Sequence, residues 1–288
     1  MKKSKLAKVL TVSLAALMVF GLASCGGGSG KVSDKDITVI SREEGSGTRD
    51  AFTELTGVLQ DDVDKTVDTA EISNSTSVVT QSVAGNDAAI GYISLGSLDD
   101  TVKAVKVDGV EATVDNIKSG EYKIQRPFNI VTKGEVKELP ADFIKFIMSK
   151  DGQKIIEDEG YISVNDNAEA YKASGLKGSI TLAGSTSVSP VMEVLADKYK
   201  ELNSGVTIEI QQTGSGAGIQ STTEGVCDIG MASRELKDEE TSQGLKSEEI
   251  ALDGIAVIVN KDNGVEDLSM DQIMKIFTGE ITNWADVK

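Results

Sequence analysis

The sequence contains no histidine and only two cysteines in 288 residues. Without histidine, neither Ser-His-Asp nor Cys-His catalysis is available. Cys25 is treated separately below, which leaves Cys227 alone, so no disulfide can form within one molecule and no cysteine cluster can hold zinc. We interpret Cys227, in "GVCDIGMAS", as a small buried apolar residue rather than a reactive thiol. These absences predict a protein that is not an enzyme and uses no metal or cofactor.

Positive charge is scarce, since 29 lysines and arginines face 46 aspartates and glutamates, for a formal net charge of −17. A surface of this sign repels nucleic acid, so we predict that DNA and RNA are not partners. The same charge slows the approach of a small anion. It does not prevent short-range dipoles and hydroxyls in a closed cleft from holding one.

The apolar run near the N-terminus, residues 9–22, is shorter than the roughly 20 residues that a transmembrane helix needs. It follows four lysines and predicts a signal peptide over residues 1–24. The sequence Leu22-Ala23-Ser24-Cys25 resembles the bacterial lipobox, which implies cleavage before Cys25 and lipid on its sulfur; a plain signal peptide with an incidental cysteine is the alternative. Residues 25–30 are then a glycine-rich tether, and we expect an extracytoplasmic protein anchored by lipid to the outer face of the bacterial cell membrane.

Short β-rich runs alternate with amphipathic stretches, which is typical of an α/β fold. The runs "DITVIS", "SITLAGS" and "VTIEIQQ" predict strands. Apolar residues at spacings of three and four predict a helix whose core face carries Val188, Met192, Leu195, Tyr199 and Leu202.

Three segments share the order strand, small polar loop, helix: "SITLAGSTSVSPVMEVL", "IEIQQTGSGAGIQSTTEG" and "DITVISREEGSGTRDAF". Helix N-termini leave unpaired N–H groups and carry about half a positive charge, and Ser and Thr hydroxyls add donors. One such loop indicates only a capped helix. Three of them, with Arg42 beside the third, predict a site for a small oxyanion.

Seven motifs together resemble the phosphate-binding protein of the bacterial phosphate ABC transporter. They are "ITLAGSTSVSP", "QQTGSGAGIQ", "CDIGMASREL", "IALDGIAVIVN", "IFTGEITNW", "SREEGSGTR" and "AAIGYISLG". The resemblance implies an α/β, type II periplasmic-binding-protein-like fold, in which two lobes joined by a hinge close on one ion. It also implies a monomer that delivers inorganic phosphate to the permease subunits of an ABC transporter.

The order of these motifs differs from that of the family. There "AGSTSVSP" comes first, and "TGEITNWADV" precedes "ITVISREEGSGTR"; here the chain ends after "TGEITNWADV" and resumes that order at Lys31. We interpret this as a circular permutation with the family's ends joined near residues 171–179; a misassembled gene is the alternative. The family topology then implies a lobe II of residues 31–126 plus 259–288 and a lobe I of residues 127–258, with Lys288 near Lys31 to Asp36.

The resemblance also implies which residues bind the ion. Arg42 supplies a charge-assisted contact, unless it merely forms a surface salt bridge with a neighbouring acid. Glu44 accepts a proton that phosphate carries and sulfate lacks, which would exclude sulfate, unless it merely caps the turn. The remaining expected phosphate-binding residues are Thr186, Ser187, Ser215, Ser46, Gly47 and Thr48.

The motif "MASREL" departs from the family, because many relatives carry an aspartate where this chain has Arg234 after Ser233. Either Arg234 contacts the ion, or it pairs with Glu235 or another acid. We keep both Ser233 and Arg234 as predicted site members. Two rival functions remain open: a receptor for sulfate, molybdate or another oxyanion, and a lipoprotein of this fold that serves sensing or adhesion.

Overall fold

The computed structural model describes residues 32–287, and the alternation expected from the sequence is present in it. The helices are α1 (Gly47–Thr56), α2 (Thr76–Gly85), α3 (Val114–Lys118), α4 (Glu138–Ile147), α5 (Lys150–Asp158), α6 (Ser189–Leu202), α7 (Ser215–Glu224), α8 (Asp238–Thr241) and α9 (Met270–Phe277). Short 3₁₀ turns are η1 (Val32–Asp34), η2 (Leu95–Ser97) and η3 (Trp284–Asp286). None of the helices in this range is long and apolar enough to cross a membrane.

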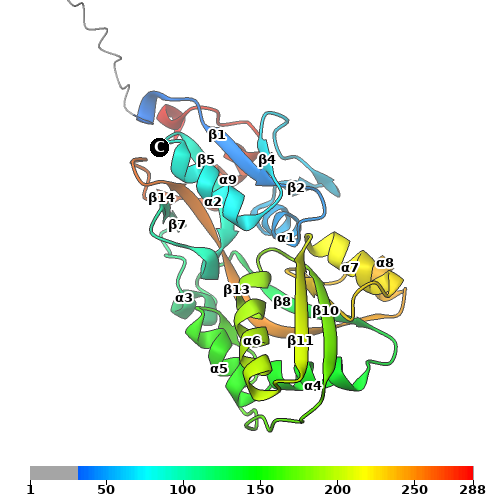
Figure 1. Cartoon of the computed structure of the whole chain (residues 1–288). Helices are drawn as coiled ribbons and strands as arrows, with labels where there is room; N and C mark the ends of the chain where they lie inside the picture. Colours follow the sequence, from blue (N-terminus) through cyan, green and yellow to red (C-terminus); the bar gives the residue numbers. More distant parts are fainter. Residues whose placement is uncertain (1–31, 288) are drawn as a thin grey trace, which may run out of the picture. The chain divides into compact units, whose positions relative to one another are not determined.

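The strands are β1 (Thr38–Arg42), β2 (Leu59–Gln60), β3 (Val63–Asp64), β4 (Glu71–Ser73), β5 (Ala89–Ser94), β6 (Val102–Ala104), β7 (Lys106–Val107), β8 (Gln125–Lys133), β9 (Ile162–Ser163), β10 (Gly178–Gly184), β11 (Val206–Gln212), β12 (Ile229–Ala232), β13 (Leu245–Asn260) and β14 (Asp267–Leu268). The main sheet has the order β11-β10-β12-β8-β13-β5-β1-β4, and Figure 1 shows β13 running from the β5 side to the β10 side. β10 is parallel to β11 and β12, and β1 is parallel to β4 and β5, whereas β8 and β13 are antiparallel to their neighbours.

The two largest of four hydrophobic clusters among residues 32–287 draw on different halves of β13. One contains Phe128, Leu182 and Leu195, and the other contains Phe52, Tyr92 and further residues of α1, β5 and α9. In the predicted helix, Val188, Met192, Leu195 and Tyr199 are fully buried. Leu202, by contrast, is 40% exposed, because it is the last residue of α6 and lies beyond the core.

Along β13, the residues pass from one hydrophobic cluster to the other before position 258, where the sequence analysis placed the boundary between the lobes. Ala251 packs in the core with Phe128, whereas Ile255 and Val257 pack in the core with Tyr92. We therefore use "lobe I" for residues 127–254 and "lobe II" for residues 32–126 and 255–287, which moves the proposed boundary in β13 from 258/259 to 254/255.

The two ends of the described chain lie side by side in lobe II. The Ile37 amide donates to the Thr282 carbonyl at 2.8 Å, and the Trp284 amide donates to the Lys35 carbonyl at 3.0 Å. Asp36 and Asn283 form an antiparallel bridge. Residues 35–37 are therefore in contact with residues 282–284, and the closeness of Lys288 to Lys31–Asp36 stays a prediction. Lys31, Lys288, Cys25, the signal segment and the tether lie outside the described residues.

Candidate functional site

Four helices begin where the two lobes meet. α6 and α7 belong to lobe I and follow β10 and β11, while α1 and α2 belong to lobe II and follow β1 and β4. Their first turns face this junction, where the partial positive charges of the helix N-termini add up; some first-turn N–H groups are already bonded, such as those of Val78 to Ser75 Oγ and of Gly216 to the Gly45 carbonyl. The order strand, small polar loop, helix predicted for three segments is thus confirmed, and β4–α2 is a fourth.

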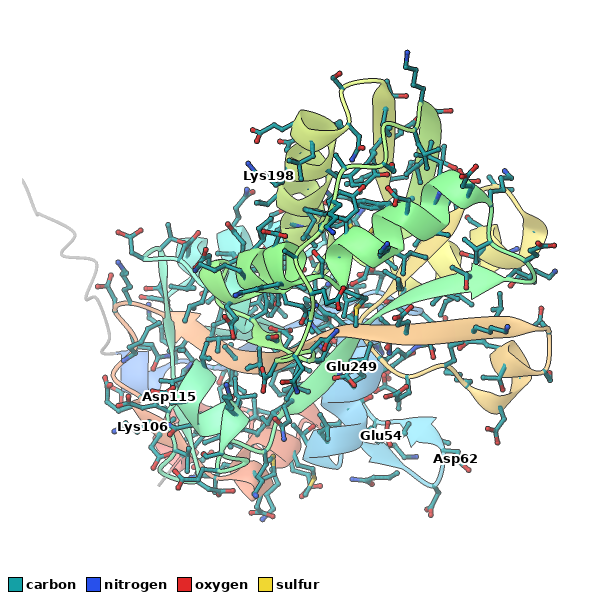
Figure 2. The ribbon with its side chains drawn as sticks, turned by 90° about the horizontal axis from the view of Figure 1, so that it is seen from below. Glu54, Asp62, Lys106, Asp115, Lys198 and Glu249 are labelled. Atoms are coloured by element: carbon teal, nitrogen blue, oxygen red, sulfur yellow. The ribbon has the colours of Figure 1, made fainter. Side chains whose placement is uncertain are left out.

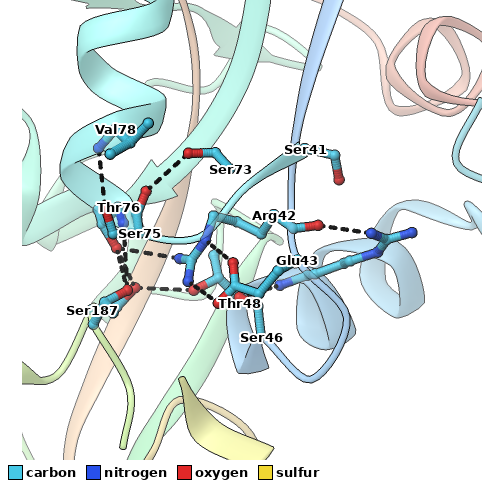
Figure 3. Close-up of polar contacts among 12 residues, drawn as sticks. Ser41, Arg42, Glu43, Ser46, Thr48, Ser73, Ser75, Thr76, Val78 and Ser187 are labelled. Carbon is cyan, nitrogen blue, oxygen red and sulfur yellow. Dashed lines mark hydrogen bonds and ion pairs between the residues drawn. The ribbon is translucent and has the colours of Figure 1, made fainter. Parts of the chain in front are cut away.

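Buried hydroxyls join the lobes directly. Thr48 Oγ1 of α1 lies 2.9 Å from Ser187 Oγ, which comes just before α6. Thr76 Oγ1, at the start of α2, lies 3.2 Å from Thr186 Oγ1 and 3.1 Å from Ser187 Oγ. Figure 3 shows dashed contacts that link Ser187 to both Thr76 and Thr48. The predicted residues Thr186, Ser187 and Thr48 are therefore brought together by contacts between lobes.

A second group of hydroxyls lies in lobe I against Gly47. Ser233 Oγ is 3.3 Å from Ser215 Oγ and 3.0 Å from Ser185 Oγ. A Cβ atom on Gly47 would lie only 2.5 Å from Ser215 Oγ and 2.7 Å from Ser233 Oγ, so glycine is required for this approach. The predicted Ser215, Gly47 and Ser233 thus meet in one buried cluster.

Arg42 is the buried cation of the site, with 2% of its surface exposed. Its Nη1 donates to Thr76 Oγ1 at 3.4 Å. Its Nε and Nη2 each donate to the Glu43 carboxylate at 2.8 Å, the two-nitrogen contact that best orients a guanidinium. Ser46 caps α1, because its hydroxyl accepts from the Arg49 amide at 3.4 Å.

The carboxylate beside Arg42 belongs to Glu43, and this geometry does not support the role expected for Glu44. The Ser46 amide donates to the Glu43 carbonyl and closes a turn, in which Gly45 has a φ of 81°. Glu44 occupies the outer corner of that turn and its side chain is exposed, whereas Glu43 is close enough to hold Arg42 (Figure 3).

Arg234 pairs with acids, which is the second of the two roles expected for it. Its Nη1 and Nη2 donate to the two carboxylate oxygens of Glu240 at 2.8 Å, and its Nε lies 2.9 Å from Asp50 Oδ2. Glu235 contributes only its backbone carbonyl. Burial lowers the pKa of Arg234, but the Glu240 and Asp50 carboxylates more than offset this, so that the pKa is raised.

Thr76 is a site residue that the sequence analysis missed. A signal was present, because "EISNSTSVVTQ" has the same order of strand, small polar loop and helix start as the three recognised segments. Thr76 is buried and bonds to Arg42, Thr186 and Ser187. Ser185 was missed as well, although it stands in the quoted "AGSTSVSP" motif and bonds to Ser233.

A buried ion pair lies where β8 and β13 pass between the lobes. Arg126 Nη2 and Asp253 Oδ2 are 3.1 Å apart, and both side chains are 1% exposed. Ser94 Oγ donates to Asp253, and Arg126 Nη1 donates to the Ser233 carbonyl. Burial raises the pKa of Asp253 to about 6, although Arg126 and Ser94 act against that shift.

Two cavities flank the contacts between the lobes. One of about 570 Å³ is lined by Thr76, Thr186 and further Ser, Thr and Gln side chains. The other, of about 430 Å³, is lined by Asp50, Arg126 and Arg234 among others. Within residues 32–287, no group of three His, Cys, Asp or Glu side chains is arranged to hold a metal ion.

Comparison with known proteins relates this architecture to one family. The family model of the PBP superfamily domain matches residues 28–151 and 169–288. PstS 2 of Streptococcus agalactiae serotype V, a phosphate-binding protein, is 52% identical over 294 residues, covering 100% of this chain and 99% of that protein.

Two further relatives differ in how much of the chain they match. The crystal structure of a phosphate ABC transporter, phosphate-binding protein from Streptococcus pneumoniae TIGR4 has a TM-score of 0.71 and 49% identity, and the match covers 88% of this chain and 100% of that one. PstS of Bacillus subtilis is 38% identical over 127 residues, which is 43% of this chain and 42% of that protein. On these matches the chain belongs to the PBP superfamily and, within it, to the PstS family of phosphate-binding proteins.

Proposed function

We propose that this protein captures inorganic phosphate between its lobes and delivers it to the permease of an ABC transporter. One observation carries the proposal: four helix N-termini and a buried arginine converge on hydroxyls contributed by both lobes. N–H groups, hydroxyls and a guanidinium are the donors that an oxyanion accepts from. The names of the full-length relatives support the same ligand.

Binding of the ion would require the lobes to separate. The hydroxyl oxygens now lie 2.9 to 3.2 Å apart, so the space between them is taken by their mutual hydrogen bonds. A tetrahedral anion would replace these bonds with contacts to its own oxygens. Because the donors come from both lobes, the anion would favour the closed arrangement, which is the state that a permease could recognise.

We propose a phosphate site that differs from the sequence expectation by two additions, one replacement and one removal. Thr76 and Ser185 join it, and Glu43 takes the part of the carboxylate that faces the ligand and accepts its proton. Arg234 is assigned to the contact between lobes described in the next subsection. The remaining members are Arg42, Ser46, Gly47, Thr48, Thr186, Ser187, Ser215 and Ser233.

Calorimetric titration of the soluble chain from Gly26 with phosphate and then sulfate at neutral pH tests the function. We expect one-to-one phosphate binding and no sulfate heat. Glu43→Gln should lose discrimination against sulfate, because an amide can donate to an unprotonated oxygen. Glu44→Gln is the matched control and should behave as the wild type; the reverse result would return the role to Glu44, and sulfate binding by the wild type would reject phosphate specificity.

We also propose that the order of the two segments is a circular permutation. The contact between residues 35–37 and 282–284 supports it, since the family's chain would run continuously there. The half-length match to the Bacillus subtilis relative supports it too, because a collinear alignment of permuted chains covers one segment only. The full-length streptococcal match indicates that the order is shared, which argues against a misassembled gene.

The proposed location follows from the N-terminal segment. We propose a monomer outside the cytoplasm, held on the outer face of the cell membrane by lipid on Cys25, where it can meet the permease. Metabolic labelling with an alkyne fatty acid should mark the wild type and leave Cys25→Ala unmarked. Equal labelling of both proteins would reject lipidation at Cys25.

A further inference from the structure

An ion pair between the buried Arg234 and the partly buried Asp50 joins the lobes beside the hydroxyl cluster. Asp50 is on α1 of lobe II, one helical turn after Ser46, and Arg234 follows Ser233 in lobe I. Arg234 Nε and Asp50 Oδ2 are 2.9 Å apart, and the side chains are 8% and 29% exposed. Neither atom has a hydrogen-bond partner of good geometry, so their charges are compensated by each other and, for Asp50, by the nearby Lys237 ammonium.

Besides its contact with Asp50 of lobe II, Arg234 is held in position by residues of its own lobe. Glu240 accepts from both terminal nitrogens of the guanidinium, and the Lys237 amide donates to the same carboxylate. The Arg234 carbonyl accepts from Asn129 of β8, which fixes the backbone as well. A guanidinium fixed in this way loses little side-chain freedom when it meets Asp50.

We propose that the Asp50–Arg234 pair is a latch that stabilises the closed arrangement of the lobes and thereby sets phosphate affinity. The inference rests on the proposed function for its ligand. Since the two charges belong to different lobes, separating the lobes breaks the pair and leaves Arg234 with Glu240 alone. The latch therefore contributes only to the closed state, and a contact of that kind tightens any ligand that requires closure.

Electrostatics alone makes the opposite prediction, which gives a sharp test. Asp50 and Glu240 balance Arg234 and Lys237, whose ammonium lies 3.7 Å from Asp50. Asp50→Asn leaves one more positive charge close to the anion site. Simple attraction would then tighten phosphate binding, whereas loss of the latch would weaken it.

The experiment is calorimetric titration with phosphate of the wild-type chain, Asp50→Asn and Glu54→Gln. Glu54 is on the same helix and lines the same cavity, and its side chain is exposed (Figure 2), so Glu54→Gln is a control of equal charge change. We expect Asp50→Asn to raise the dissociation constant about fivefold, and Glu54→Gln to leave it unchanged or slightly lower. Binding by Asp50→Asn that is as tight as or tighter than that of Glu54→Gln would overturn the latch.

A second variant tests the same ion pair from the Arg234 side. A second readout, made without phosphate, tests the closed arrangement independently of the ligand. Arg234→Lys retains the charge but cannot contact Glu240 with two nitrogens and Asp50 with a third, so it should weaken binding as well. In small-angle scattering without phosphate, Asp50→Asn should have a larger radius of gyration than the wild type and Glu54→Gln. Failure of the wild type to bind phosphate would reject the proposed function alone, whereas equal radii for all three proteins would reject the latch.

Discussion

At the scale of single residues, the carboxylates of this protein have very different surroundings. Glu240 is partly buried, which alone would raise its pKa, but hydrogen bonds from Arg234 and the Lys237 amide lower it overall. Asp253 is buried more deeply, and there burial outweighs its partners Arg126 and Ser94. The difference decides how each carboxyl responds to acid.

The Asp253 carboxyl should titrate near pH 6 in the folded protein, well above its ordinary value of 3.8. The folded state then holds this proton more tightly than the unfolded chain does. Asp253 therefore lowers the free energy of unfolding as pH rises from about 4 to about 6, and it has no further effect above that range. Carboxyl carbon NMR against pH measures the midpoint, with Asp253→Asn to assign the signal; a midpoint near 4 would contradict the expectation.

The residues that sequence reasoning missed or misplaced share a physical cause. Glu43 and Glu44 are adjacent acids, and only the geometry of the turn decides which one reaches Arg42. Arg234 finds one partner on the other lobe, at Asp50, and such a contact between distant segments leaves no local pattern in the sequence. Thr48, Thr186 and Ser187 were expected from the family resemblance, and Thr48 lies at the start of α1 while Thr186 and Ser187 lie in the loop before α6.

At the scale of elements, glycine allows helices to approach the sheet and each other. Gly218, in α7, faces β10 so closely that a Cβ would lie 2.4 Å from Gly184 Cα and 2.5 Å from the Ala183 carbonyl oxygen. Those neighbours are backbone atoms and cannot move aside independently. The order of strand, loop and helix could be predicted from the sequence. The close approach of α7 to β10 could not, because it depends on the register of one element against the other.

Gly218→Ala should therefore destabilise the protein by about 3 kcal/mol, the upper range for overpacking a well-packed interior. Gly85→Ala is the matched control, since Gly85 is the last residue of α2 and has open space around its missing Cβ. That change should stabilise the protein by about 0.5 kcal/mol, through helix propensity and reduced freedom of the unfolded chain. Urea unfolding of both variants measures the difference, and equal midpoints would refute the packing argument.

At the scale of the whole molecule, we expect the order of the segments to be separable from the fold. The ends meet in lobe II, through residues 35–37 and 282–284. The segment near residues 171–179, where we propose that the family's two ends are joined, lies in lobe I. Tyr171 and Ser174 on this segment both donate hydrogen bonds to Asp142 of the same lobe. Opening the chain at that joint would lose few contacts.

A chain reopened after Lys172 and closed by a short linker between Lys288 and Lys31 should fold and bind phosphate within about threefold of the original, since ends that lie close make rearrangement tolerable. Calorimetry and thermal unfolding of the reordered protein measure this. A reordered chain that does not fold would show that the present order is needed for the fold, contrary to the proposal.

The two strands between the lobes also limit the direction in which the lobes can move. β8 and β13 are paired from Lys133 and Leu245 to Gln125 and Gly254, with an irregularity between Glu249 and Ala251, so the two connections leave lobe I side by side in a hydrogen-bonded ribbon. Such a ribbon resists sliding of one strand past the other, because sliding breaks its ladder, but it flexes readily out of its own plane. We therefore expect the lobes to rock out of the plane of this ribbon rather than to slide within it.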